Sequence, residues 1–203
     1  MIALIDYGMG NLLSVRKALE HVGGQDVALV DSPAALAGAD AVVLPGVGHF
    51  GDGAKHLRGR GLDKPIAAAF REGKPFLGIC LGMQLLMESS EEAPGVAGLG
   101  LVKGGVKRFP AASGLKVPQI GWNGVDFQKR VPCVQGLESG EHFYFVHSYY
   151  VAPDDPSLTV GVTDYGISFC ACLGADNWFA TQFHPEKSQD AGLLILRNFV
   201  QSI

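Results

Sequence analysis

The chain has 203 residues, of which 47% are apolar, and a formal net charge of −4. That length and apolar content suffice to bury one full-sized core, so we expect a single domain over residues 1–203. The acidic balance lacks the basic patch of a nucleic-acid binder, and no apolar stretch reaches the ~20 residues of a membrane span. Asp6 follows the first five residues directly, without a signal-peptide pattern. We therefore expect a cytoplasmic protein that binds neither nucleic acid nor membrane.

The first half of the chain alternates short apolar runs with amphipathic segments. The apolar runs predict strands at residues 2–5, 27–30, 41–44 and 75–79. Helices are expected at residues 12–22, after the Ser32–Pro33 cap, and at residues 53–58 and 66–71. This β–α alternation predicts a parallel, doubly wound sheet.

The second half is rich in strands and turns. Strands are expected at residues 106–109, 117–120, 142–151, 158–162, 169–173 and 178–183. A last helix, capped by Ser188, is expected to face the sheet through Leu193, Leu196 and Val200. The predicted fold class is therefore α/β, with a doubly wound, largely parallel sheet and additional antiparallel strands in the second half.

Residues 78–82 read GICLG between an apolar run and a helical segment. A strand that turns at once into a helix crowds its backbone and favours glycine on both sides of the turn. The pattern predicts a nucleophile elbow with Cys80 at a helix N-terminus, where the helix dipole and free N–H groups favour the thiolate. The alternative is a buried structural cysteine between two packing glycines.

Residues 46–51 read GVGHFG and match the G-x-G-x-x-G pattern of dinucleotide sites. They follow the third expected strand and begin after Pro45, whereas a dinucleotide site needs its complete βαβ context. Another use is favoured, because the loop leaves the edge of a parallel sheet where ligands bind. The N–H groups of Val47 and Gly48 can face Cys80 and supply half of an oxyanion hole, with Leu81 N–H as the other donor.

His184 is the strongest candidate for a base that serves Cys80. The other histidines are expected on exposed helices or packed within strands: His21, His49, His56, His142 and His147. His184 ends an expected strand, and Glu186 lies two residues further on. In an extended chain these two side chains point the same way, so the carboxylate can orient the imidazole and stabilise its charged form. A chance ion pair is the alternative, but together with the elbow we favour a Cys80–His184–Glu186 triad.

The four cysteines have no zinc-ligand spacing, because Cys170 and Cys172 are separated by one residue rather than two. We expect them to be reduced in a cytoplasmic protein. No metal and no cofactor is expected.

Residues 78–84 (GICLGMQ) and 183–188 (FHPEKS) together resemble the class I, triad-type glutamine amidotransferase family. The resemblance runs from the first strand to the last helix and implies a flavodoxin-like α/β domain. It implies that the substrate is free glutamine, whose side-chain amide is hydrolysed to glutamate and ammonia by the triad. It also implies contacts with glutamine from Gln84 and from the backbone of His147, Ser148 and Tyr149.

Three further stretches resemble the branch of that family found in histidine biosynthesis: residues 5–12, residues 44–48, and residues 121–123 with 144–149. This branch implies a heterodimer that passes ammonia through a tunnel into a (β/α)8-barrel cyclase subunit. Trp122, Asn123 and Tyr144 are then candidates for the partner interface. A peptide between two glycines flips at low steric cost, so Val47 N–H could turn away and leave the chain weakly active without its partner.

Two rival interpretations remain open. One is another glutamine amidotransferase, such as the glutaminase of pyridoxal phosphate synthase. The other is a non-enzymatic flavodoxin-like domain with a reactive cysteine, which could keep the elbow but has no need of the His-Pro-Glu sequence at residues 184–186.

Overall fold

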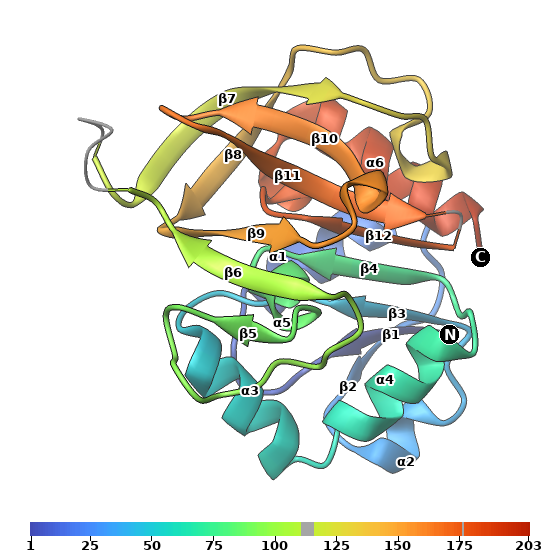
Figure 1. Ribbon diagram of the computed structural model, residues 1–203. Helices are drawn as coiled ribbons and strands as arrows, with labels where there is room; N and C mark the ends of the chain where they lie inside the picture. Colours follow the sequence, from blue (N-terminus) through green and yellow to red (C-terminus); the bar gives the residue numbers. More distant parts are fainter. Residues whose placement is uncertain (111–115, 176) are drawn as a thin grey trace.

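The computed structural model describes residues 1–110, 116–175 and 177–203. Over these residues nine strands form one sheet in the order β2-β1-β3-β4-β12-β11-β10-β7-β8 (Figure 1). The parallel part comprises β1 (Ile2–Ile5), β2 (Val27–Val30), β3 (Ala41–Leu44), β4 (Phe76–Ile79) and β12 (Trp178–Thr181). The antiparallel part comprises β7 (Gln119–Phe127), β8 (Glu141–His147), β10 (Thr159–Asp164) and β11 (Ser168–Ala175).

A smaller sheet lies against this one. Within the described residues its three strands are β5 (Ser89–Ser90), β6 (Gly104–Arg108) and β9 (Tyr149–Pro153). In the described ranges, single turns of 3-10 helix connect later elements at η2 (Pro132–Val134), η3 (Pro156–Leu158) and η4 (Pro185–Lys187).

Helices cover both faces of the large sheet, which is why its central parallel strands β1, β3 and β4 are buried throughout. On one face Ile2 and Leu4 of β1 pack in a core with α1 (Leu12–His21) and α6 (Gln189–Gln201). On the other face Ala3 and Ile5 pack in a core with four helices (Figure 1): α2 (Pro33–Leu36), α3 (Phe50–Gly59), α4 (Asp63–Arg71) and α5 (Leu81–Leu85). Among the described residues, no helix is both long and apolar enough to cross a bilayer.

The strands predicted for the first half are confirmed, with β4 one residue shorter than expected. The expected run at residues 142–151 instead divides at Ser148 into β8 and β9, which belong to different sheets. β12 also differs from the expectation of added antiparallel strands, because it lies beside β4 and runs parallel to it. The parallel sheet therefore takes its fifth strand from the C-terminal part of the chain.

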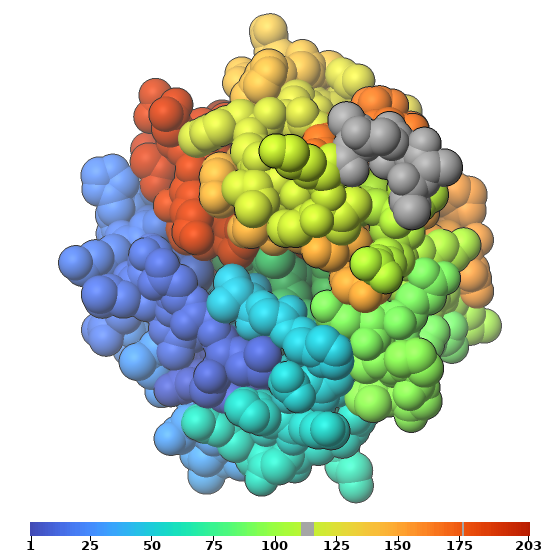
Figure 2. Space-filling view, turned by 90° about the vertical axis from the view of Figure 1, so that its left-hand side faces the viewer, coloured from blue at the N-terminus to red at the C-terminus, as the bar shows by residue number. Residues whose placement is uncertain are grey.

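The carboxyl ends of the parallel strands bring distant segments together at one edge. β4 leads into Cys80, β3 into residues 45–48, and β12 toward His184. Figure 2 views this edge, where segments from both ends and the middle of the chain meet around a central hollow. Ligands bind at this edge in open parallel sheets.

Candidate active site

Cys80 joins β4 to α5 in a strained backbone conformation, with φ 54° and ψ −107°. A non-glycine residue persists there only when its surroundings enforce it. The flanking glycines supply that enforcement: a Cβ on Gly82 would collide with the Leu44 carbonyl oxygen, and one on Gly78 would lie 3.1 Å from Ala180 Cβ. The predicted elbow is thus present, and Cys80 lines a pocket at the sheet edge.

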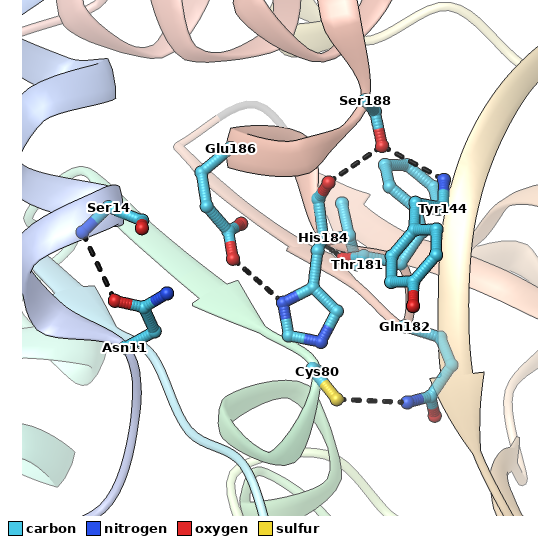
Figure 3. Close-up of polar contacts among 10 residues, drawn as sticks. Asn11, Ser14, Cys80, Tyr144, Thr181, Gln182, His184, Glu186 and Ser188 are labelled. Atoms are coloured by element: carbon cyan, nitrogen blue, oxygen red, sulfur yellow. Dashed lines mark hydrogen bonds and ion pairs between the residues drawn. The ribbon is translucent and has the colours of Figure 1, made fainter. Parts of the chain in front are cut away.

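His184 and Glu186 form a buried pair directed at this cysteine. His184 Nδ1 lies 2.8 Å from Glu186 Oε1, and the two side chains are 2% and 1% exposed. In Figure 3 the imidazole lies between Glu186 and Cys80. His184 Nε2 is buried and has no hydrogen-bond partner among the described residues, so it is free to exchange a proton with a group at the sulfur.

The local backbone differs from the extended chain that was expected. Residues 185–187 form a 3-10 turn, because Pro185 fixes φ at the first position of η4. The turn still carries the Glu186 carboxylate back to the imidazole. The pairing was therefore predicted correctly, but its geometric reason was wrong.

The charge state of His184 depends on competing influences. Burial alone would lower the pKa of the imidazole, but the neighbouring Cys80 and Glu186 side chains outweigh burial and raise the pKa to about 10. This balance favours an imidazolium beside the Cys80 sulfur. Such a pair supplies both a nucleophile and a proton donor without a separate activation step.

The side chain of Ser188 fixes the position of His184. Its Oγ donates to the His184 carbonyl oxygen at 2.6 Å and accepts from Tyr144 N–H at 3.0 Å (Figure 3). Ser188 is the N-cap residue of α6, as predicted, but in the described part of the chain its side chain makes no capping hydrogen bond to the helix. His184 N–H also donates to the Tyr144 carbonyl oxygen at 3.0 Å, which ties the imidazole to β8.

A pocket of about 410 Å³ opens at the elbow. It corresponds to the hollow in Figure 2. Its lining consists of Val47, Gly48, Cys80, Leu81, Gln84, Glu92, Pro118, Val146, His147, Ser148 and Tyr149. Every predicted oxyanion and substrate-binding residue is among them. A larger hollow of about 680 Å³ lies at Arg130–Glu138, but no candidate residue lines it.

The predicted oxyanion donors are present but not arranged as a hole. Leu81 N–H donates to the Gly46 carbonyl oxygen at 3.3 Å. In a trans peptide the N–H points opposite to the C=O, so Val47 N–H is directed away from Leu81. A carbonyl therefore occupies the place where an oxyanion would be bound.

The Tyr149 carbonyl oxygen accepts hydrogen bonds from two side chains, Gln84 and His147. The Tyr149 carbonyl oxygen lies 3.1 Å from Gln84 Nε2 and 2.8 Å from His147 Nδ1. Because a carbonyl only accepts, the proton of neutral His147 is on Nδ1. Burial lowers the pKa of His147 to about 4, so this histidine stays neutral and presents Nε2 as an acceptor.

Two residues of the site were missed in the sequence. Glu92 lines the pocket, and its carboxylate accepts from Phe50 N–H at 2.8 Å. Gln182 directs its amide at Cys80 Sγ, with an N–S distance of 3.7 Å. The position of Gln182 two residues before His184 could have revealed it, whereas nothing local distinguishes Glu92 from its neighbours. The histidines expected at the surface are exposed: His21, His49 and His56. His142, which was expected to be packed within a strand, is exposed as well, so that expectation is wrong.

The three candidate interface residues do not share one face. Trp122 is 44% exposed, and its ring lies 6.1 Å from the Tyr144 ring across the β7–β8 pair. Asn123 follows Trp122 in β7 and points to the opposite side, where its amide donates to the Asp164 carbonyl oxygen at 2.8 Å. Trp122 and Tyr144 therefore form one patch, and Asn123 supports the sheet behind it.

The remaining cysteines are buried within the core. Burial raises the pKa of both Cys133 and Cys170 to about 12 and that of Cys172 well above its usual range. Within the described ranges no group of three or more His, Cys, Asp or Glu side chains is placed to hold a metal ion.

Comparisons with known proteins agree with this geometry. The family model described as "Glutamine amidotransferase class-I" matches residues 3–203. A protein from Syntrophotalea carbinolica named "Imidazole glycerol phosphate synthase subunit HisH" is 52% identical over 204 residues, 98% of each chain. A protein of the same name from Microcystis aeruginosa is 50% identical over 205 residues, 100% of this chain and 96% of the other.

Solved structures share the fold at lower identity. One described as "Crystal structure of glutamine amidotransferase" has a TM-score of 0.77 at 20% identity, covering 100% of this chain and 98% of the other. Another, "Structure of PurLQS from Thermotoga maritima", has a TM-score of 0.74 at 23% identity, covering 100% and 96%. The chain belongs to the class I glutamine amidotransferase family.

Proposed function

We propose that this chain is the glutaminase subunit of imidazole glycerol phosphate synthase. It hydrolyses the side-chain amide of glutamine to glutamate and ammonia, and it delivers the ammonia to a cyclase partner in histidine biosynthesis. The observation that carries the proposal is the strained elbow, which holds Cys80 against the buried His184–Glu186 pair. The names of relatives about 50% identical over the whole chain support the same activity and the need for a partner subunit.

The reaction runs through an acyl-enzyme. The Cys80 thiolate attacks the carboxamide carbon, and the carbonyl π electrons move to oxygen to form a tetrahedral oxyanion. His184 gives its proton to the departing nitrogen, so ammonia leaves and a thioester remains. His184 then takes a proton from water, which attacks the thioester and expels glutamate with the thiolate restored. Glu186 keeps Nδ1 protonated and stabilises the imidazolium at the beginning and end of the cycle.

The pocket has groups that match free glutamine. The substrate carries an α-ammonium, an α-carboxylate and a neutral amide. Glu92 lines the pocket, and its negative charge complements the positive α-ammonium. Gln84, His147, Ser148 and Tyr149 line another part of the wall. We assign glutamine binding to these residues.

The partner we propose is a (β/α)8-barrel cyclase subunit, forming a heterodimer with this chain. It would use the ammonia to convert a ribotide precursor into imidazole glycerol phosphate and an aminoimidazole carboxamide ribotide. Exposed apolar side chains favour docking near the pocket, with Ile120 63%, Trp122 44% and Val47 38% exposed. Tyr144 lies beside Trp122 and hydrogen-bonds to the His184 backbone, so contact at this patch has a short route to the triad.

We also infer a single cytoplasmic domain over residues 1–203. One sheet combines strands from both halves of the chain, with β12 beside β4, which supports folding as one unit. The expected absence of a cofactor remains part of the proposal.

A coupled assay tests this function. Glutamine labelled with ¹⁵N in its amide is supplied with the cyclase subunit and its ribotide, and transfer of the label into imidazole glycerol phosphate is followed by mass spectrometry. We expect label transfer with the wild-type chain and none with Cys80→Ala. Replacing the cyclase by the synthase subunit of pyridoxal phosphate synthase should give no transfer. Transfer to that second partner, or none to the first, would contradict the assignment.

A further inference from the structure

A hydrogen-bond relay connects the pocket wall to the sulfur of Cys80. Gln84 Nε2 donates to the Tyr149 carbonyl oxygen at 3.1 Å and to Gln182 Oε1 at 3.0 Å. Gln182 Nε2 then donates to Cys80 Sγ at 3.7 Å, a separation within the range of hydrogen bonds to sulfur. Figure 3 shows the Gln182 amide on the opposite side of the sulfur from the Glu186 carboxylate.

The chemistry of the relay fixes the direction of each amide. The Tyr149 carbonyl can only accept, so Gln84 must present its amino group there. The second N–H of that group points at Gln182, which must therefore present its carbonyl oxygen. The amide nitrogen of Gln182 is then left facing Cys80, and its orientation follows from the network.

Both amide side chains of the relay are buried, away from water that could replace their hydrogen bonds. Gln182 is 0% exposed and Gln84 is 5% exposed, so each polar atom needs a partner inside the protein. A thiolate is a better acceptor than a thiol, and a hydrogen bond to a charged group is the stronger kind. A buried N–H donor beside the sulfur thus favours the charged form of the nucleophile.

We propose that Gln182 is a positioning residue for the nucleophile, whose amide N–H holds the Cys80 sulfur as a thiolate directed into the pocket. The proposal rests on the assigned role of Cys80. Gln182 differs from His184 in being a donor that cannot give up its proton. It therefore continues to stabilise the sulfur after His184 has passed its proton to ammonia, and again when the thiolate is expelled from the second tetrahedral intermediate.

Alkylation of Cys80 by iodoacetamide tests the proposal without using glutamine. The rate at Cys80, located by peptide mapping, is measured against pH in the full-length chain. Gln182→Met removes the donor at similar volume, and we expect the midpoint of the profile to move up by about one pH unit. Gln182→Glu keeps the shape but places an anion beside the sulfur, so its midpoint should move further up.

Thr181→Val is the matched control, at the last residue of β12 and next to Gln182 in the chain. It removes a buried hydrogen bond from Thr181 Oγ1 to the Phe183 carbonyl oxygen without touching the sulfur. Its midpoint should equal that of the wild type. A Gln182→Met profile that coincides with wild type, or a Thr181→Val profile that shifts as far, would overturn the proposal. Failure of the coupled ammonia assay would leave this readout intact, so the two hypotheses fail separately.

A second measurement follows the Gln182 side chain itself by NMR. In ¹⁵N-labelled wild-type protein the side-chain amide protons of Gln182 should shift with the titration of the Cys80 sulfur, and the shift should vanish in Cys80→Ala. Gln84→Met should raise the alkylation midpoint less than Gln182→Met does. The double variant should match Gln182→Met alone, because the relay acts through one final donor. If the chemical shifts of the Gln182 side-chain amide protons do not change as the Cys80 sulfur titrates, the relay is contradicted.

Discussion

His184 is buried, yet the two groups at its ring nitrogens hold it in its charged form. Its pKa is raised from the ordinary value of 6.5 to about 10. Because the folded value lies above the unfolded one, the charged pair contributes fully to stability below pH 6.5, and the contribution is lost as the pH rises through about 10. Glutaminase activity should decline over the same alkaline range, as the proton needed by the leaving ammonia is lost.

Removing the Cys80 sulfur should show how far it counteracts the effect of burial on the pKa of His184. In Cys80→Ala the influence of the sulfur on His184 is gone, while burial still opposes the imidazolium. The pKa of His184 should therefore fall, as measured by NMR titration of its ring protons. His147, whose pKa burial lowers to about 4, is the internal reference in the same spectra. A His184 pKa that stays near 10 would show that Glu186 alone sustains the charge.

The three triad residues should be unequal under substitution. Cys80→Ala and His184→Ala remove groups that make bonds or transfer protons, so glutamine hydrolysis should nearly vanish. Glu186→Gln removes only charge support and orientation, and the comparable change in a serine protease costs about 10⁴ in kcat. With a thiolate already favoured, we expect a smaller loss, measured as kcat for glutamate release. A Glu186→Gln enzyme as inactive as Cys80→Ala would refute this division of roles.

Cys80 should be the cysteine that reacts quickly with a glutamine-like electrophile such as a chloroketone analogue. It lines the pocket, whereas burial raises the pKa of Cys133 and Cys170 to about 12 and keeps them as thiols. Peptide mapping after brief exposure checks the prediction. Equal labelling of several cysteines would contradict it.

At the scale of elements, the β4–α5 junction depends on close contacts rather than on helix propensity. Gly82→Ala places a methyl group on the Leu44 carbonyl oxygen, so we expect a loss of about 1–3 kcal/mol in unfolding free energy together with most of the activity. Gly59→Ala is the matched control, because a Cβ at Gly59 in α3 meets nothing within 4 Å. It should leave activity unchanged and raise stability by about 0.4–1 kcal/mol. Denaturant titration and an activity assay compare the two, and equal effects would contradict the packing account.

The early strands and the elbow could be predicted from sequence because their causes are local. Residues 2–5 and 41–44 are buried on both faces and read as continuous apolar runs. The elbow glycines mark the turn directly. The relay from Gln182 to Cys80 joins residues 102 apart. It depends on β12 lying parallel to β4, a register that no hydrophobic period encodes.

Other parts of the site depend on contacts between elements in the same way. Ser188 has the composition of a helix cap, but its hydroxyl bonds to the His184 and Tyr144 backbone because β8 lies beside η4. Glu92 enters the pocket by accepting from Phe50 at the start of α3. The chemistry of the residues was enough to predict the triad. The positions of Ser188 and Glu92 around it could be seen only in the tertiary fold.

At the scale of the whole molecule, the isolated chain has its nucleophile in place but its oxyanion site closed. Leu81 N–H donates its hydrogen bond to the Gly46 carbonyl oxygen. Val47 N–H must therefore turn inward before Leu81 and Val47 can both donate to an oxyanion. Loss of one oxyanion donor in a protease costs about 10²–10³ in rate. The exposed patch around Trp122 offers a surface through which a docked partner could favour the open loop. Such coupling would limit wasteful hydrolysis of glutamine.

Steady-state release of glutamate from glutamine, with and without the cyclase subunit and its ribotide, tests this account most directly. We expect slow release from the chain alone and a rise of about 10²–10³ when partner and ribotide are both present. Cys80→Ala should show no release in either condition. Equal rates with and without the partner would mean that the closed oxyanion site does not limit the enzyme, and would contradict the account.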